Sequence, residues 1–202
     1  MMNTKTLQYT KTLSALPQQG RHLRAWYDQD EVLVYIPHIG EYYGDNTVSR
    51  PVWVTPSFSW MMHHAQWLES PHYEAIECMT IQRFAFDDML LQAFPADFPN
   101  GKFESETDWE KEKAGALIQY RWQPDFTPDG QQSNYEILLL GIHSRTWMQH
   151  VIKSHVLTYN DIDEALFMQK EHTQPPYELL VVPDEQAYPI DDTLKKALDI
   201  IG

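Results

Sequence analysis

The chain has 202 residues, of which 43% are hydrophobic and 22% charged, so it can form a core and is not a disordered polymer. Its 15 Lys and Arg residues against 29 Asp and Glu residues give a net charge of −14, which disfavours duplex nucleic acid as a partner. Its single cysteine, Cys78, excludes an internal disulfide and a four-cysteine zinc site.

No apolar run approaches the roughly 20 residues that a membrane-spanning helix needs, since the longest covers residues 137–142. Residues 1–20 also lack an apolar stretch of signal-peptide length. We therefore expect a soluble, cytoplasmic protein with no membrane partner. Residues 1–20 are expected to be a flexible lead-in, and residues 21–202 a single globular domain.

The first half of the chain predicts three strands, a helix, a further strand and a second helix. Residues 24–27 and 32–36 alternate apolar and polar side chains around Asp28-Gln29-Asp30, which predicts a hairpin, and residues 52–54 follow as a strand. Ser57 is expected to cap a helix whose apolar side chains recur at helical spacing: Trp60, Met61, His64, Trp67 and Leu68. A buried strand is expected at 74–79, and then a helix capped by Thr80 that turns Phe84 inward.

In the second half, the charged residues 97–113 predict a solvent loop or a short surface helix. Strands are expected at 117–122 and 135–142, joined by a segment with the turn signal Pro128-Asp129-Gly130. Helices are expected from Ser144, from Asp161 and over 192–201, with a strand at 179–182. The pattern indicates an α+β fold with a mixed, mostly antiparallel sheet flanked by four or five helices.

The histidines do not have the spacing of a metal site. His63, His64 and His72 lie close together, but neighbouring side chains on a helix point about 100° apart and give no i, i+4 pair. We therefore expect no metal, and we interpret His64 as a hydrogen-bonded residue of the packed helix face. Cys78 lies in an apolar strand, which favours a small buried hydrophobe over a nucleophile.

Residues 53–62 combine three aromatic side chains with a strand-to-helix turn. Two interpretations of this segment remain open. The backbone amides near Ser57 and Ser59 can receive an anion, because unpaired N–H groups converge at a helix N-terminus. Alternatively, Ser57 is only a cap and the aromatic residues are only core, which requires no ligand.

Several of these motifs resemble the bacterial and fungal domain-of-unknown-function family 4291. The family pattern is close to I-R-A-x-Y, V-Y-Q-A-Y and T-W-I-K-P-S-F-L-W-M-M-Y-R-S-G-W, and the chain has Arg24-Ala25-x-Tyr27, Val34-Tyr35 and WVTPSFSWMMHHAQW at 53–67. Later motifs agree in order over about residues 22–190: Ala75-Ile76-Glu77, Ile118-Gln119 with Trp122, Pro124 and Asp125, Leu140-Gly141-Ile142, and Pro183-x-Glu185-x-x-Tyr188-Pro189.

The chain departs from the family pattern at polar positions. Thr55 replaces a Lys, His64 an Arg, Gln66 a Gly, Ile36 a Gln and Glu136 an Arg. Aromatic and apolar positions are kept while polar and cationic ones are lost. The chain therefore resembles a divergent member in which the scaffold persists and the ligand site has changed.

The order of the motifs is similar to that of the ADP-ribosyltransferase fold. In that fold an Arg or His holds the nicotinamide nucleotide, a Ser or Tyr supports it, and a late Glu or Gln engages the ribose. Cleavage of the bond to nicotinamide needs an anion clamp and a carboxylate that faces an oxocarbenium-like centre. The resemblance implies NAD as cofactor, with catalytic roles for Glu136 and Ser57. It implies ligand contacts from these residues: Arg24, Tyr35, Thr55, Trp60 and His64.

A second hypothesis belongs to a different class of function. The same scaffold can be a non-catalytic binding protein with an aromatic groove, because the family's cationic positions are lost. Its net charge of −14 favours a basic protein partner, and such an association weakens with added salt. A nucleotide ligand and a basic protein are thus the two partners that the sequence suggests.

Overall fold

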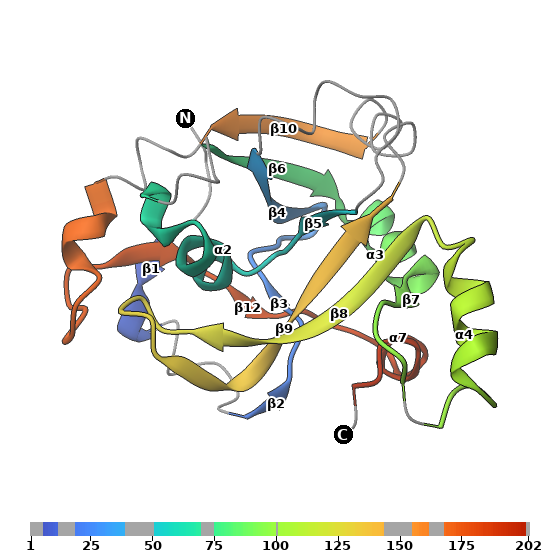
Figure 1. The fold of residues 1–202 in the computed structure, drawn as a ribbon. Helices are drawn as coiled ribbons and strands as arrows, with labels where there is room; N and C mark the ends of the chain where they lie inside the picture. Colours follow the sequence, from blue (N-terminus) through green and yellow to red (C-terminus); the bar gives the residue numbers. More distant parts are fainter. Residues whose placement is uncertain are drawn as a thin grey trace.

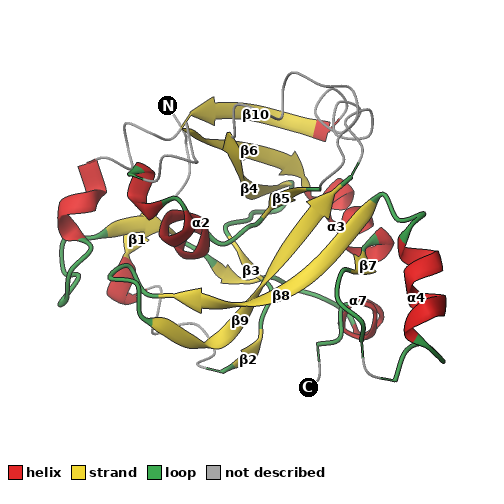
Figure 2. Cartoon of the chain, viewed as in Figure 1, coloured by secondary structure: helices red, strands yellow, loops and turns green. Residues whose placement is uncertain are grey.

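The computed structural model describes residues 6–11, 19–38, 51–69, 75–99, 101–143, 155–161 and 168–200. In these residues strands and helices are interspersed in one α+β domain, as predicted (Figures 1 and 2). The α-helices are α2 (Phe58–His64), α3 (Arg83–Gln92), α4 (Glu106–Lys113) and α7 (Asp192–Ala197). The longer strands are β4 (Glu31–His38), β6 (Ala75–Gln82), β8 (Ile118–Phe126), β9 (Gln132–Ile142) and β10 (Val156–Asp161). The shorter strands are β1 (Thr6–Gln8), β2 (Gly20–Arg21), β3 (Arg24–Ala25), β5 (Val52–Val54), β7 (Phe94–Pro95), β11 (Val181–Pro183) and β12 (Gln186–Ala187). Two 3₁₀ turns are also present: η2 (Gln66–Leu68) and η3 (Lys170–His172).

The strands pair mostly antiparallel, as predicted, but they are divided among several sheets. One sheet has the order β10-β6-β4, and a larger one has the order β2-β9-β8-β7, with β5 also paired to β9. β2 with β9 and β7 with β8 are parallel pairs. The two sheets are joined where Tyr35 of β4 and Thr55 exchange backbone hydrogen bonds, at N···O distances of 2.8 and 3.2 Å.

Strand β9 separates two hydrophobic clusters, because alternate side chains of a strand point to opposite faces. Tyr135 and Ile137 join a cluster with Phe58 and Met61 of α2. Leu138 and Leu140 join the other cluster, together with residues of α3 and α7. In Figure 1, α2 accordingly lies on the left of the hairpin, and α3 and α7 lie on the right.

Several local predictions are confirmed. β5 covers residues 52–54, and Tyr27 and Val32 form a β-bridge at the predicted hairpin. Ser57 caps α2, where its Oγ accepts a hydrogen bond from the Trp60 N–H at 3.4 Å. The helix nevertheless ends at His64, because Gln66 and Trp67 take left-handed backbone conformations with φ of 49° and 52°.

Other local predictions are wrong. Thr80 does not cap a helix: it lies inside β6, paired with Leu33 of β4, and α3 begins only at Arg83. Phe84 is 63% exposed rather than turned inward. Asp161 is the last residue of β10, and the start of the helix expected from it lies outside the described residues. The helix expected from Ser144 lies outside the described residues.

The N-terminal and C-terminal parts of the chain pair with each other. β1 pairs with β11, and Tyr9, within the segment expected to be flexible, is 2% exposed. β12 pairs with β3, which fixes the strand that carries Arg24. Among the described residues, no helix has the length and apolar character needed to cross a membrane.

Candidate functional site

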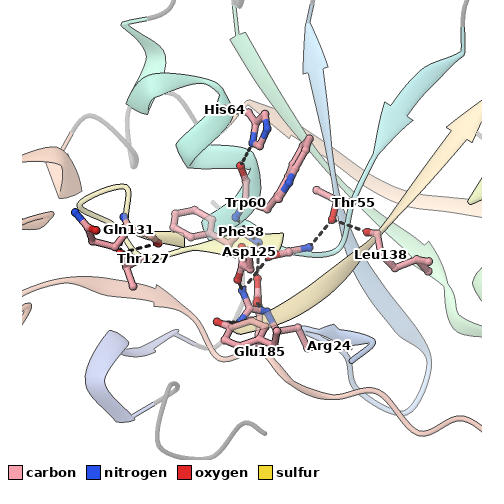
Figure 3. Close-up of polar contacts among 12 residues, drawn as sticks. Arg24, Thr55, Phe58, Trp60, His64, Asp125, Thr127, Gln131, Leu138 and Glu185 are labelled. Carbon is pink, nitrogen blue, oxygen red and sulfur yellow. Dashed lines mark hydrogen bonds and ion pairs between the residues drawn. The ribbon is translucent and has the colours of Figure 1, made fainter. Parts of the chain in front are cut away.

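A charged cluster is buried next to the N-terminus of α2 (Figure 3). The Arg24 side chain is 4% exposed and forms ion pairs with Asp125 and Glu185, which are 0% and 4% exposed. Its Nε lies 3.0 Å from Glu185 Oε2, and its Nη2 donates to Asp125 Oδ2. Arg24 also donates to Tyr135 Oη at 2.6 Å and to Ser57 Oγ at 2.9 Å.

Segments far apart in the sequence position these side chains. Arg24 lies on β3, which is paired with β12. Glu185 lies in the short turn between β11 and β12, where its N–H donates to Pro183 O at 2.8 Å. The pairing of β8 with β9 is irregular between Pro124 and Phe126, and this irregularity contains Asp125. The cluster therefore exists only when the C-terminal segment is docked.

Protein oxygens already occupy amides at the start of α2. The Ser57 N–H donates to Thr55 Oγ1 at 3.1 Å, and the Phe58 N–H donates to Glu185 Oε1 at 2.6 Å. Thr55 Oγ1 in turn donates to Leu138 O at 2.9 Å. The anion that the sequence suggested for this helix N-terminus is thus the chain's own Glu185 carboxylate, stabilised there by the N–H group and the helix dipole.

The protonation of the cluster is set by burial and by its charges. Burial raises the pKa of Glu185 to about 7, with Asp125 adding to the rise and Arg24 and the Phe58 N–H opposing it. Burial alone would lower the pKa of Arg24, but Asp125 and Glu185 raise it, so the guanidinium stays charged. Near neutral pH the cluster can therefore gain or lose one proton, at Glu185.

Three buried polar atoms around Arg24 lack a hydrogen-bond partner in the described structure: Tyr9 Oη, Tyr35 Oη and Asp125 Oδ1. Burial raises the pKa of both tyrosines, and the charge of Arg24 lowers it in each. Buried polar groups in native proteins nearly always have partners, protein or water. Three unpartnered oxygens around one ion cluster therefore mark a place that suits a polar ligand or water.

The structure brings only part of the expected site together. Arg24 and Ser57 are in contact. Thr55 accepts the Ser57 N–H, and Tyr35 forms a backbone bridge with Thr55, so these two residues lie next to the contact. Trp60 and His64 instead form a separate pair one turn along α2, with ring centroids 3.6 Å apart and His64 Nδ1 3.0 Å from Trp60 O. Burial lowers the pKa of His64, which favours the neutral ring.

Glu136 is not brought to this cluster. It follows Tyr135 on β9 and so points to the opposite face of the strand. There its Oε2 lies 3.0 Å from Arg21 Nε, and its side chain is 39% exposed. The carboxylates that contact Arg24 are Asp125 and Glu185, and neither was a predicted site residue.

The only sequence signal for these two carboxylates was their place in the family motifs. Asp125 follows Trp122 and Pro124, and Glu185 follows Pro183, in the motifs that resemble the family. No pattern in the sequence pointed to Tyr9 or Tyr135, because their role depends only on the side chains that pack around them.

The family model described as "Domain of unknown function (DUF4291)" matches residues 22–188. The match includes all three charged members of the cluster: Arg24, Asp125 and Glu185. No curated protein and no solved structure matches the chain.

Proposed function

The chain belongs to the DUF4291 family, and we propose that it binds NAD at the buried Arg24 cluster and cleaves the bond to nicotinamide in the manner of an ADP-ribosyltransferase. In this proposal Glu185, and not Glu136, supplies the catalytic carboxylate. The protein would act in the cytoplasm, where a free buried thiol such as Cys78 stays reduced.

One observation carries the proposal: Arg24, Ser57 and Glu185 meet in one cluster. Arg24 contacts Ser57 at 2.9 Å and Glu185 at 3.0 Å. These residues follow the chain order Arg, Ser, late Glu that is expected for an ADP-ribosyltransferase fold. Buried ion pairs contribute little net stability, because desolvation costs about as much as pairing returns. A group whose pKa is displaced toward neutrality is also typical of functional sites.

The chemistry assigns a role to each residue. The C–N glycosidic bond of NAD breaks, its electron pair neutralises the pyridinium nitrogen, and water attacks C1′ to give ADP-ribose and a proton. Ionised Glu185 faces the positive charge that develops at C1′ and stabilises it. Arg24 orients Glu185, and Ser57 contacts the ligand while it caps α2.

The test compares two matched variants, Glu185→Gln and Glu136→Gln. NAD raises the melting temperature of the wild type, because a ligand that binds only the folded state stabilises it by about 2.7 kcal/mol at 100 times Kd. Glu185→Gln keeps a side-chain oxygen that accepts the Phe58 N–H, so this variant is expected to keep the NAD-induced rise in melting temperature. Its rate of nicotinamide release is expected to fall at least about 100-fold. Glu136→Gln changes neither quantity, since Glu136 lies on the other face of β9.

The pH profile provides an independent check. Nicotinamide release rises with pH and levels off above pH 7, because only the ionised carboxylate stabilises the positive centre and the pKa of Glu185 is about 7. If NAD neither shifts the melting temperature nor releases nicotinamide, the enzyme proposal fails. If Glu136→Gln is the inactive variant, the choice of Glu185 fails.

A second candidate is favoured by how completely the cluster is enclosed. Arg24, Asp125 and Glu185 are almost fully buried and form ion pairs with one another. Partly exposed aromatic rings lie next to them: His63 stacks on Phe126 with centroids 3.6 Å apart, and Trp67 meets the buried Phe58 ring edge-on. In this candidate the family scaffold is a non-catalytic binding protein whose aromatic surface takes the cationic side chains of a basic partner.

Pull-downs with the purified chain at roughly 50 and 500 mM salt test this candidate, since screening lengths differ about threefold between these conditions. A basic protein is expected to bind at low salt and to dissociate at high salt. His63→Ala should weaken its recovery, while His172→Ala, on η3, should not. Recovery that is insensitive to salt removes the electrostatic basis of the candidate.

A further inference from the structure

A cavity of about 490 Å³ lies beside α4, at the opposite end of β8 from Asp125. α4 contributes Trp109 and Lys113 to its wall, and the segment between α4 and β8 contributes Leu117. Gln119 of β8 and His143, the residue after β9, also line it. Its volume lies in the range of pockets that take small organic ligands. It is separate from the Arg24 cluster and does not depend on the function proposed above.

Two polar side chains in the wall are available for recognition. The His143 backbone N–H donates to Leu117 O at 3.0 Å, but its ring Nε2 is buried and has no hydrogen-bond partner among the described residues. Burial and the nearby charge of Lys113 lower the pKa of His143, so the ring is neutral at neutral pH. Gln119, which is 4% exposed, adds an amide with both a donor and an acceptor.

The charges of the wall do not favour an ion. Glu110 and Lys113 have opposite charges and both line the cavity. The Lys113 ammonium is already engaged, since Nζ donates to Ala96 O and lies 4.3 Å from the centre of the Trp109 ring. The remaining wall is made of small or apolar residues: Ala114, Gly115, Ala116 and Leu117.

We propose that this cavity binds an uncharged planar heterocycle with adjacent donor and acceptor groups, the pattern of a nucleobase edge. The Gln119 amide pairs with that edge, as Gln pairs with the adjacent amino and ring-nitrogen groups of adenine. Nε2 of His143 forms a further hydrogen bond, which satisfies an atom that has no partner within the described part of the chain.

Adenosine is the probe, because it presents adenine without a phosphate charge. Titration calorimetry is expected to give saturable binding, and the ring nitrogen signals of His143 should shift in nuclear magnetic resonance spectra of the labelled protein. Gln119→Leu keeps the side-chain bulk but removes the amide, so Kd rises about tenfold or more. The matched control is Gln123→Leu, the same change on the same strand but at a residue that does not line the cavity, and it leaves Kd unchanged.

A second variant covers the case in which Gln119→Leu does not fold. His143→Phe keeps a ring of similar size without nitrogen atoms, and it is expected to weaken adenosine binding as well. The proposal is overturned if adenosine gives no saturable binding, or if neither variant weakens it. It is also overturned if adenosine monophosphate binds much more tightly than adenosine, because the cavity then selects an anion.

Discussion

Burial and ion pairing act in opposite directions on Glu185. Its carboxylate lies 3.0 Å from Arg24 Nε and accepts the Phe58 N–H, and both contacts favour the charged form. Its complete enclosure favours the neutral form and has the larger effect, so the pKa rises from 4.5 to about 7. Glu185 is therefore an acid that the fold stabilises in its protonated state.

This displacement predicts how stability depends on pH. Between pH 4.5 and 7 the folded chain holds the Glu185 proton more tightly than the unfolded chain, so the free energy of unfolding falls as pH rises through this window. The loss from this one residue is about 3 kcal/mol at pH above 7. Glu185→Gln cannot ionise, so its stability relative to the wild type should rise between pH 4.5 and 7.5.

Urea denaturation of the wild type and Glu185→Gln at several pH values measures this difference. Glu136→Gln is the matched control, because Glu136 is partly exposed and lies outside the cluster. A difference between the wild type and Glu185→Gln that does not change with pH would show that Glu185 is not protonated near neutrality.

At the scale of elements, the β8–β9 hairpin organises the larger sheet. β9 pairs with β8, β5 and β2, and Trp53 of β5 covers Gly141 of β9. A Cβ atom placed on Gly141 would lie 2.9 Å from two ring carbons of Trp53 and 3.1 Å from Pro51 Cβ. The absence of a side chain at Gly141 is thus what lets the Trp53 ring approach the strand this closely.

We predict that Gly141→Ala destabilises the protein by about 1–3 kcal/mol, because the added methyl group overpacks the contact with Trp53. Gly115→Ala is the matched control: its Cβ would lie 3.6 Å from Glu112 O, an ordinary contact, and stability should change little. Thermal unfolding of both variants measures the difference. Equal midpoints for the two would contradict the predicted clash.

At the scale of the whole molecule, the C-terminal segment completes the fold. β11 pairs with β1 near the N-terminus, and β12 pairs with β3. Val182 enters the cluster packed on α2, while Tyr188, Leu194 and Leu198 enter the cluster packed on α3. Both hydrophobic clusters and the Arg24 ion cluster therefore depend on this segment.

A chain that ends after residue 180 is accordingly predicted not to unfold cooperatively. It loses four core side chains, leaves β1 and β3 without partners and leaves Arg24 without Glu185. Calorimetry and circular dichroism test this against a chain that ends after residue 200, which keeps every described residue. A sharp unfolding transition in the shorter chain would show that the C-terminal segment is an accessory element.

The amino-acid sequence determined the features that depend on neighbouring residues and on family motifs. Ser57 caps α2, residues 52–54 form a strand and the fold is α+β, because capping and hydrophobic periodicity act over a few residues. The resemblance to the family likewise needed only motifs and their order. Only the tertiary structure decided that Thr80 extends a strand, because pairing with Leu33 outweighs the local capping signal.

The tertiary structure alone also decided the composition of the site. The sequence favoured Glu136, but alternation along β9 turns Tyr135 toward Arg24 and Glu136 away from it. Glu185 reaches Arg24 because β12 pairs with β3, a contact between the two ends of the chain. Burial and pKa depend on which distant segments pack together, so no local pattern could reveal which carboxylate the fold places against the guanidinium.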